Sequence, residues 1–182
     1  MEIAILSDTH VPDQAEQLPN QFREHVQEAD HVVHAGDFGS NQALANVREL
    51  ADDLTAVYGN ADPVGIDLPA VASVTVSGVT FVVSHGIINF VERAVSSSEG
   101  VVFDRDDWLD AVADTARARA DADDEVVGIG GHSHEVEDEY HDGVRVLNPG
   151  SATGVGPADG TATMMTVEVS AGAVDVTLHE SP

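Results

Sequence analysis

Short apolar runs separated by longer amphipathic stretches dominate the first two thirds of the chain. Runs of this length, bounded by turn residues, are typical of buried strands, and the stretches between them have helical periodicity. The alternation therefore predicts a parallel sheet with crossover helices. The predicted strands in this part of the chain are residues 2–7, 31–35, 55–58, 71–76 and 80–84.

Three segments have the apolar spacing of amphipathic helices, namely residues 14–28, 40–51 and 106–120. Ser40 begins the second segment and is a residue type that caps helix N-termini. Residues three and four positions apart share one face of a helix, so the apolar side chains can face a sheet. The residues of these faces are Leu44, Val47 and Leu50 in the second helix and Leu109, Val112, Ala113 and Ala116 in the third.

Four more strands are predicted toward the C-terminus, over residues 125–130, 144–148, 162–169 and 173–179. A short Ser-Ala-Gly turn joins the last two, so the end of the chain is predicted to form a β-meander. Residues 86–104 are the least regular segment. This segment is either a lid over a site or a surface loop, and the sequence leaves both alternatives open.

Length and composition indicate one domain, residues 1–182, with enough apolar residues for a packed core. No run approaches the roughly 18–20 apolar residues of a membrane-spanning helix, so no membrane interaction is expected. The N-terminus lacks the features of a signal peptide, which predicts a cytoplasmic location. The absence of cysteine agrees with that location and excludes disulfides and thiolate ligands.

The chain is strongly acidic, with 33 acidic residues, seven arginines, no lysine and a formal net charge of −26. Salt screens this self-repulsion, because the Debye length falls to about 3 Å at 1 M. We therefore hypothesise that the protein works in a salt-rich cytoplasm. An acidic disordered tail and a nucleic-acid mimic are the alternatives, and the spread of acids between apolar runs disfavours the tail.

Side chains of the types that bind metal ions follow the first three predicted strands. Asp8 and His10 are two residues apart, a spacing that places both on one side of an extended chain. Asp37 follows the second strand, and Asn60 follows the third, where Gly59 permits a tight turn. Carboxylate, amide and imidazole groups are ligands of hard and borderline metal ions.

Three histidines continue this pattern. His85 ends the fifth strand, and His132 and His134 follow two glycines after another apolar run. Taken alone, each of these residues is more typical of a turn, a helix cap or a hydrogen-bonded histidine. Ligands of open α/β sheets bind beyond the carboxyl ends of the strands, so the whole ordered set predicts a metal site there.

The order of these motifs resembles that of the calcineurin-like metallophosphoesterase superfamily, and in particular its small prokaryotic phosphodiesterase branch. The family's Asp-x-His, Gly-Asp, Gly-Asn, His-Gly and Gly-His-x-His are matched at residues 8–10, 36–37, 59–60, 85–86 and 131–134. The branch's Asn-Pro-Gly-Ser loop is present at 148–151. The resemblance implies an α/β fold, a four-layer α/β/β/α sandwich of the metallo-dependent phosphatase type.

The same resemblance implies two divalent metal ions at one end of the sheets, with Mn expected first and Ni, Fe or Zn as alternatives. A metal-bridging hydroxide would attack the phosphorus, so no side chain acts as the nucleophile. Asp37, Asn60 and His85 are also counted as catalytic residues. The implied ligands are Asp8, His10 and His134 for the first ion, Asn60, His85 and His132 for the second, and Asp37 as the bridge between them.

The chain departs from the wider family at two positions that can supply a general acid. Ala61 stands where many members have a histidine after Gly-Asn, and Ile87 and Ile88 stand where a second histidine often follows His-Gly. General acid–base catalysis typically contributes about 10²–10⁴-fold. We therefore hypothesise that diesters with good leaving groups are hydrolysed faster than alkyl monoesters.

Several other polar residues are less informative. Asp62 either orients the Asn60 loop or caps a turn, and the 148–151 loop either offers N–H groups to a phosphate or completes a turn. The serines beside the predicted ligands are interpreted as structural residues at strand ends. The residues without an assigned role are His25, His31, His34, His141, His179 and Trp108.

These observations predict a metal-dependent phosphodiesterase that hydrolyses a small phosphodiester or nucleotide. Long nucleic acid is not expected as a substrate, because the sequence has no basic stripe to neutralise its phosphates. The resemblance also suggests a homodimer. The alternative is a non-catalytic protein-interaction scaffold, since a eukaryotic trafficking subunit with this fold has lost metal-binding residues. All seven predicted ligand types are intact here, which disfavours that alternative.

Overall fold

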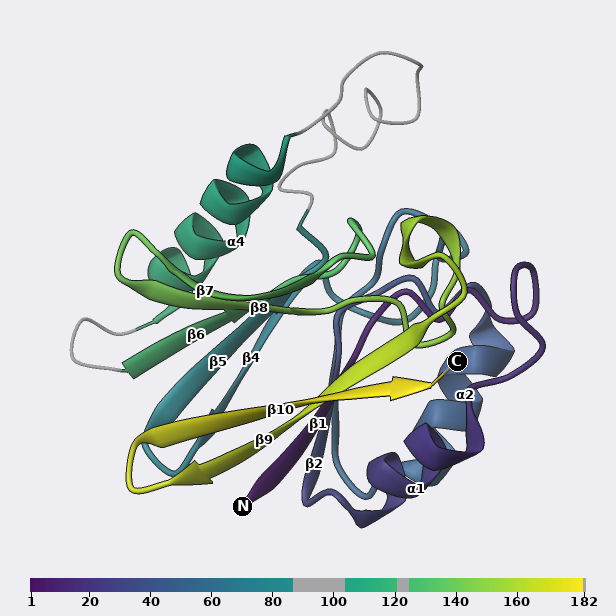
Figure 1. The fold of residues 1–182 in the computed structure, drawn as a ribbon, viewed down its shortest axis with the longest axis horizontal. Coiled ribbons are helices and arrows are strands. Elements are labelled where there is room, and N and C mark those ends of the chain that lie inside the picture. Colours follow the sequence, from purple (N-terminus) through teal and green to yellow (C-terminus); the bar gives the residue numbers. More distant parts are fainter. Residues whose placement is uncertain (87–103, 121–124, 182) are drawn as a thin grey trace.

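The computed structural model describes residues 1–86, 104–120 and 125–181, which form two facing sheets with helices outside them (Figure 1). The first sheet contains, in spatial order, β10 (Ala173–Ser181), β9 (Ala162–Ser170), β1 (Glu2–Leu6), β2 (His31–His34) and β3 (Leu54–Ala56). The second contains β4 (Val71–Val76), β5 (Val79–Ser84), β6 (Glu125–Ile129), β8 (Val144–Pro149) and β7 (Val136–His141). The helices are α1 (Asn20–Glu28), α2 (Asn41–Leu50) and α4 (Arg105–Arg119), with a short 3-10 turn at Gly156–Ala158.

Successive side chains of the central strands point to opposite faces of their sheet and pack into two different hydrophobic cores. Ile3 and Ile5 of β1 lie in the core between the two sheets, whereas Ala4 and Leu6 pack toward α1 and α2. In β5, Phe81 lies between the sheets. These strands read as continuous apolar runs because both of their faces are buried. Helix α4 covers the outer face of the second sheet, so the α/β fold has the expected α/β/β/α layers (Figure 1).

Parallel pairing brings the ends of several strands to one edge of each sheet. Strands β1, β2 and β3 run parallel in the first sheet, and β5, β6 and β8 run parallel in the second. The other pairs in both sheets are antiparallel. The prediction of one parallel sheet was therefore too simple, but the loops that follow the parallel strands do meet at one end of the sandwich.

The structure confirms helix α2 and corrects the first predicted helix. Ser40 caps α2, because its Oγ accepts the N–H of Ala43 at 3.0 Å. The helix predicted over 14–28 begins only at Asn20, with Pro19 at the N-cap position. Proline has no N–H and restricts the residue before it to extended conformations, so the helix starts after the proline.

The prediction of a C-terminal β-meander is wrong. Strand β8 belongs to the second sheet, whereas β9 and β10 form a hairpin at the edge of the first. Strand β7 was missed because its sequence, Val-Glu-Asp-Glu-Tyr-His, is charged and no residue in it is buried. A hairpin signal was available in the sequence, because the dipeptide Asp142-Gly143 is typical of two-residue hairpin turns that need positive φ at both positions. The two residues have φ values of 49° and 84° and join β7 to β8.

Two further expectations concern the irregular segment 86–104 and the absence of a membrane-spanning helix. The segment for which a lid and a surface loop are the alternatives, residues 86–104, lies outside the described residues except for Gly86 and Asp104. Within the described residues, no helix has the length and hydrophobicity that crossing a lipid bilayer requires.

Candidate metal centre

The loop after β1 leaves the extended conformation at both predicted ligands. Asp8 has φ = 52° and His10 has φ = 48°, so the expectation that an extended chain would align them is wrong. The N–H of Asp8 donates to the carbonyl of Gly36, and the N–H groups of Thr9 and His10 both donate to the carbonyl of Asp37. These bonds hold an uncommon backbone conformation and attach this loop to the loop after β2.

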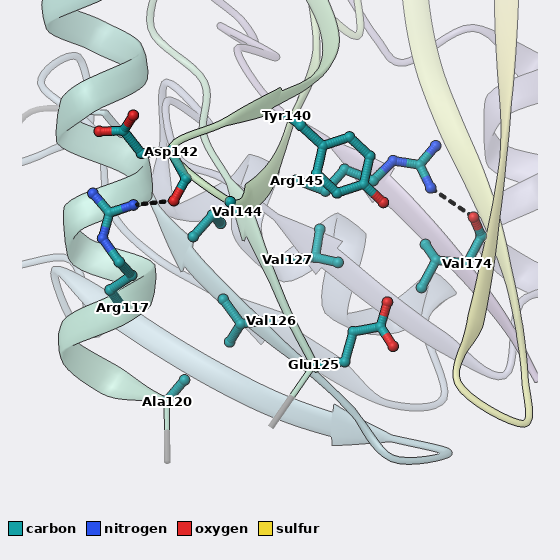
Figure 2. Close-up of a pocket in the computed structure, with 11 residues that line it drawn as sticks. Arg117, Ala120, Glu125, Val126, Val127, Tyr140, Asp142, Val144, Arg145 and Val174 are labelled. Atoms are coloured by element: carbon teal, nitrogen blue, oxygen red, sulfur yellow. Dashed lines mark hydrogen bonds between the residues drawn. The ribbon is translucent and has the colours of Figure 1, made fainter. Parts of the chain in front are cut away.

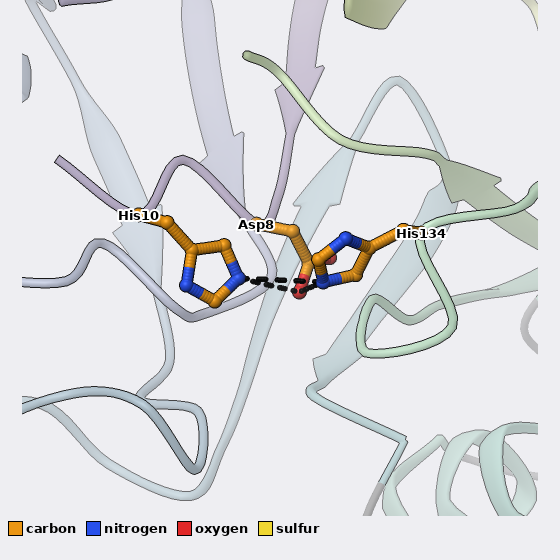
Figure 3. Close-up of side chains that lie close together, drawn as sticks. All are labelled: Asp8, His10 and His134. Atoms are coloured by element: carbon orange, nitrogen blue, oxygen red, sulfur yellow. Dashed lines mark hydrogen bonds and ion pairs between the residues drawn. The ribbon is translucent and has the colours of Figure 1, made fainter. Parts of the chain in front are cut away.

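Asp8, His10 and His134 form the first group of donors (Figure 3). His134 Nε2 lies 3.3 Å from both Asp8 Oδ1 and His10 Nε2, and His10 Nε2 lies 3.8 Å from Asp8 Oδ1. The Asp8 carboxylate also accepts the backbone N–H of His132. The loops after β1 and β6 therefore converge on one buried carboxylate.

Asn60, His85 and His132 form a second group beside the first. Asn60 Oδ1 lies 3.1 Å from His85 Nε2 and 2.8 Å from His132 Nδ1. His132 thus directs Nδ1 toward this group, whereas His85 directs Nε2 toward it. One amide oxygen and two imidazole nitrogens from three different loops meet at this point.

Asp37 connects the two groups. Its Oδ2 lies 3.6 Å from His10 Nε2 and 3.3 Å from His85 Nε2, so a single oxygen faces a donor of each group. Its Oδ1 instead accepts the backbone N–H of Ala61 at 2.7 Å. The structure therefore brings together all seven of the predicted ligand residues around Asp37.

Backbone carbonyls orient two of these histidines. His85 Nδ1 lies 2.7 Å from the carbonyl of Ala35, and His134 Nδ1 lies 2.8 Å from the carbonyl of Val155. A carbonyl only accepts, so in the neutral tautomer each Nδ1 carries the proton and Nε2 is left with a lone pair facing the centre. Histidines that bind metals in proteins are oriented in this way.

Asp62 organises the centre without belonging to either donor group. Its buried carboxylate accepts the backbone N–H groups of Asp37 at 3.0 Å, Gly39 at 3.1 Å and Gly59 at 2.8 Å. Asp62 therefore ties the loop after β2 to the loop after β3. Of the two roles left open for it, the structure favours the orienting one, acting on backbone amides.

His34 is a supporting residue that sequence reasoning missed. The N–H of Gly36 donates to its Nδ1, so its Nε2 donates to Thr9 Oγ1 at 2.7 Å. Its ring stacks on Phe38, with the ring centroids 3.6 Å apart, and is fully buried. His34 thus links the residue between Asp8 and His10 to the residue before Asp37. Its place in a buried strand gave no sign of this in the sequence.

The charges of the centre favour a bound cation. Burial alone would raise the pKa of the Asp37 carboxyl, but the neighbouring His85 lowers it below its usual value. Burial alone would lower the pKa of His85, but the Asp37 and Asp8 carboxylates raise it. The carboxylates thus hold a proton on an imidazole, and a divalent cation can satisfy the same negative charge.

Hydrogen bonds within the protein engage the polar groups of the 148–151 loop. Asn148 Oδ1 accepts the N–H of Gly150, and its Nδ2 donates to Ser133 Oγ at 2.9 Å. Ser151 Oγ donates to the carbonyl of Asp8, and Ser7 Oγ donates to the carbonyl of Gly150. These bonds favour the structural alternative for the loop, and they agree with structural roles for Ser7 and Ser133.

A pocket of about 450 Å³ lies at the other end of the second sheet, near Glu125 and Val144, the first residues of β6 and β8 (Figure 2). Both of its arginines are engaged, since Arg117 donates to the carbonyl of Asp142 and Arg145 to that of Val174. Between the lining residues Tyr140 and Asp142, His141 Nε2 lies 2.6 Å from Asp110 Oδ1. We interpret this third donor group, which includes Asp142, as a surface ion pair.

Comparison with known families agrees with this geometry. A model of the calcineurin-like phosphoesterase superfamily domain matches residues 1–172. The chain belongs to the calcineurin-like phosphoesterase superfamily. The resemblance inferred from the five motifs is therefore confirmed, and the family match covers every residue of the two donor groups.

Three proteins are similar to this chain, one in sequence and two in fold. A protein named "probable metallophosphoesterase" from Methanocaldococcus jannaschii is 30% identical over 154 residues, which cover 84% of this chain and 69% of that protein. Wild-type Vps29 from Entamoeba histolytica in complex with Zn²⁺ has a TM-score of 0.71 at 22% identity, over 100% of this chain and 98% of that one. A novel archaeal phosphodiesterase has a TM-score of 0.65 at 23% identity, over 98% and 100%. These two structural likenesses establish the fold.

Proposed function

We propose that this member of the superfamily is a divalent-metal-dependent phosphodiesterase that hydrolyses small phosphodiesters or nucleotides. The observation that carries the proposal is the position of Asp37 Oδ2 between two groups of donors, each with one oxygen ligand and two imidazoles. Such a set fits two divalent ions, because the bridging carboxylate is shared and the imidazoles add no negative charge that would repel a phosphate.

Asp8, His10 and His134 would hold one ion, and Asn60, His85 and His132 the other. When bound, such ions supply a water of lowered pKa as the nucleophile and positive charge beside the phosphoryl oxygens. The chain contributes the fixed positions of the ligands. Ala35 and Val155 orient two histidines through their carbonyls, and Asp62 holds the backbone of the bridging residue.

The absence of a proton donor at residue 61 supports a preference for diesters with good leaving groups. Ala61 is exposed next to Asn60, and its side chain is a methyl group that cannot donate a proton. Its backbone N–H is bonded to Asp37 Oδ1. A leaving group that is stable as an anion departs without protonation, so activated diesters are the favoured substrates.

Mn²⁺ is the ion that we propose, with Ni²⁺, Fe²⁺ and Zn²⁺ as alternatives. Three of the seven donors are oxygens and four are imidazole nitrogens, which suits all of these ions. The Zn²⁺ complex of a Vps29 with this fold supports a metal-binding role for the site. A salt-rich cytoplasm remains the proposed location and a homodimer the proposed oligomeric state.

The test is hydrolysis of bis-p-nitrophenyl phosphate by the full chain in molar KCl, after EDTA treatment and with Mn²⁺ added back. Metal-restored turnover that Asp37→Ala abolishes is expected. Asp67→Ala, an exposed carboxylate after β3, is the matched control and should keep wild-type turnover. A faster rate on p-nitrophenyl phosphate than on the diester would contradict the preference for diesters.

A non-catalytic scaffold is the second candidate, because Vps29 structures share this fold over the whole chain. The retained donor groups disfavour a role that needs no metal. The two candidates separate in the same assay, since a scaffold would stay folded but show no turnover with Mn²⁺, Ni²⁺, Fe²⁺ or Zn²⁺.

A further inference from the structure

Trp108 of α4 contacts the loops that follow both β5 and β6. Trp108 is 5% exposed, and its indole Nε1–H donates to the carbonyl of Gly131 at 2.9 Å. Gly131 directly precedes His132 and opens the loop that also carries His134. A helix on the outer face of the second sheet therefore has a polar contact with a loop of the metal centre.

The indole also packs against two glycines without any intervening side chain. A Cβ at Gly86, the residue after His85, would overlap the indole Nε1. A Cβ at Gly130 would lie 2.5 Å from the indole Cζ2. Real Cβ atoms do not approach this closely, so the glycines permit one ring to lie directly on both loops.

The carbonyl of Gly131 connects its own loop to α4 and to the end of β8 through hydrogen bonds. Besides the indole N–H, it accepts Nδ2 of Asn148 at 3.2 Å and the backbone N–H of Ser133 at 2.9 Å, so three donors share this oxygen. Asn148 Nδ2 also donates to Ser133 Oγ. The position of the loop between β6 and β7 is therefore determined jointly by α4 and by the end of β8.

The other buried residues of α4 have a different role. Leu109, Val112 and Ala116 pack with Val82 and Val146 against the outer face of the second sheet. They anchor the helix to the sheet, whereas the polar atom of Trp108 reaches the loop beyond the strand end. Removing that atom should therefore affect the loop more than the attachment of the helix.

We propose that Trp108 is a positioning residue for His85 and His132, and thus for the second metal position, an inference that rests on the proposed function. Trp108→Phe keeps an aromatic ring but removes the N–H. It should weaken the binding of the ion at the second position by about 10–100-fold, the usual effect of losing an orienting partner. The other ion should be affected less, because the carbonyl of Val155 still orients His134. Isothermal titration calorimetry of EDTA-treated protein in molar KCl measures both affinities.

Leu109→Ala is the matched control, because it destabilises the packing of α4 without removing a contact to the loops. It should lower the melting temperature and keep both Mn²⁺ affinities. Unchanged affinities in Trp108→Phe would overturn the inference, as would an equal loss of affinity in Leu109→Ala.

Amide hydrogen exchange of the metal-free protein tests the positioning separately. Two peptides, one that contains Gly86 and one that contains residues 130–134, should exchange faster in Trp108→Phe than in the wild type. Peptides from α1 and α2 should exchange as before. Unchanged exchange in the first two peptides would overturn the inference. Failure of the wild type to bind Mn²⁺ would instead overturn the proposed function, and with it the role of Trp108 toward a metal.

Discussion

The carboxylate of Asp62 accepts the backbone N–H of Asp37, at 3.0 Å, so a residue outside the two donor groups fixes the backbone of the residue that connects them. The same carboxylate accepts the N–H of Gly59, which precedes Asn60. Two predicted ligands on neighbouring loops thus depend on one buried side chain. A single exchange at residue 62 should disturb both.

Asp62→Asn should weaken Mn²⁺ binding by about 10–100-fold and destabilise the fold by about 1–3 kcal/mol. The amide has one acceptor oxygen in place of two, so at least one buried N–H group loses its partner. Calorimetric titration with Mn²⁺ and urea unfolding measure the two effects. Asp67→Asn, in the same connection but exposed, should change neither, and wild-type affinity in Asp62→Asn would refute the role assigned to it.

Gly59→Ala should abolish high-affinity metal binding, because a Cβ at this position would overlap Asp37 Oδ1. The carboxylate would have to leave its place between the two donor groups. Gly78→Ala is the control, since its Cβ would meet nothing within 4 Å although its φ of 87° is unfavourable for alanine. The control should lose about 1–2 kcal/mol of stability and keep its metal affinity, as seen in parallel unfolding and titration experiments.

The sequence predicted the strands near the site well because their physical signal is local. Strand β4 was predicted with its observed bounds, and β1, β2, β5 and β6 within one residue at either end. Apolar runs buried on both faces need no partner to be recognised. The sheet to which β9 and β10 belong could not be read in this way, because pairing with β1 depends on contacts distant in the sequence.

The residues of the donor groups were also predictable, whereas their support was not. Asp8, His10 and Asp37 stand in short motifs whose order is visible in the sequence. His34 and Trp108 act through hydrogen bonds to Thr9 and Gly131, which are 25 and 23 residues away along the chain. Nothing in the local sequence indicates such a partner, so neither the histidine in a strand nor the tryptophan in a helix was assigned a role.

His34 should make the stability of the fold depend on pH. Burial lowers its pKa to about 3, whereas a histidine in an unfolded chain titrates near 6.5. Between these values the unfolded chain binds a proton that the folded chain does not, so the stabilisation present above pH 6.5 is lost as the pH falls. From pH 7.5 to pH 5 this amounts to about 2 kcal/mol.

Urea unfolding of the wild type and of His34→Gln at the two pH values isolates this effect. The wild type should lose about 2 kcal/mol more than the variant, because all other titrating groups are common to both. Thr9→Val removes the hydroxyl that His34 contacts but keeps the histidine, so it should retain the wild-type pH dependence. Equal losses in the wild type and His34→Gln would show that His34 is not held neutral.

Stability should also rise with salt. Of the described acidic residues, only Asp8, Asp37 and Asp62 are buried, and all three lie at the candidate metal centre. The rest are exposed or half-buried on helices, strands and turns across the molecule, so their mutual repulsion opposes folding. An acidic tail does not account for this distribution, whereas a surface adapted to high salt does.

The melting temperature should increase by about 5 °C or more between 0.1 M and 1 M KCl, which corresponds to roughly 2 kcal/mol for a chain of this size. The Debye length falls from about 10 Å to about 3 Å over this range, so the increase should be steepest at low salt and level off near 1 M. Sucrose, which stabilises by exclusion without screening charge, should give a gradual rise with no such plateau. A melting temperature that stays constant up to 1 M KCl would contradict the proposal of a salt-rich environment.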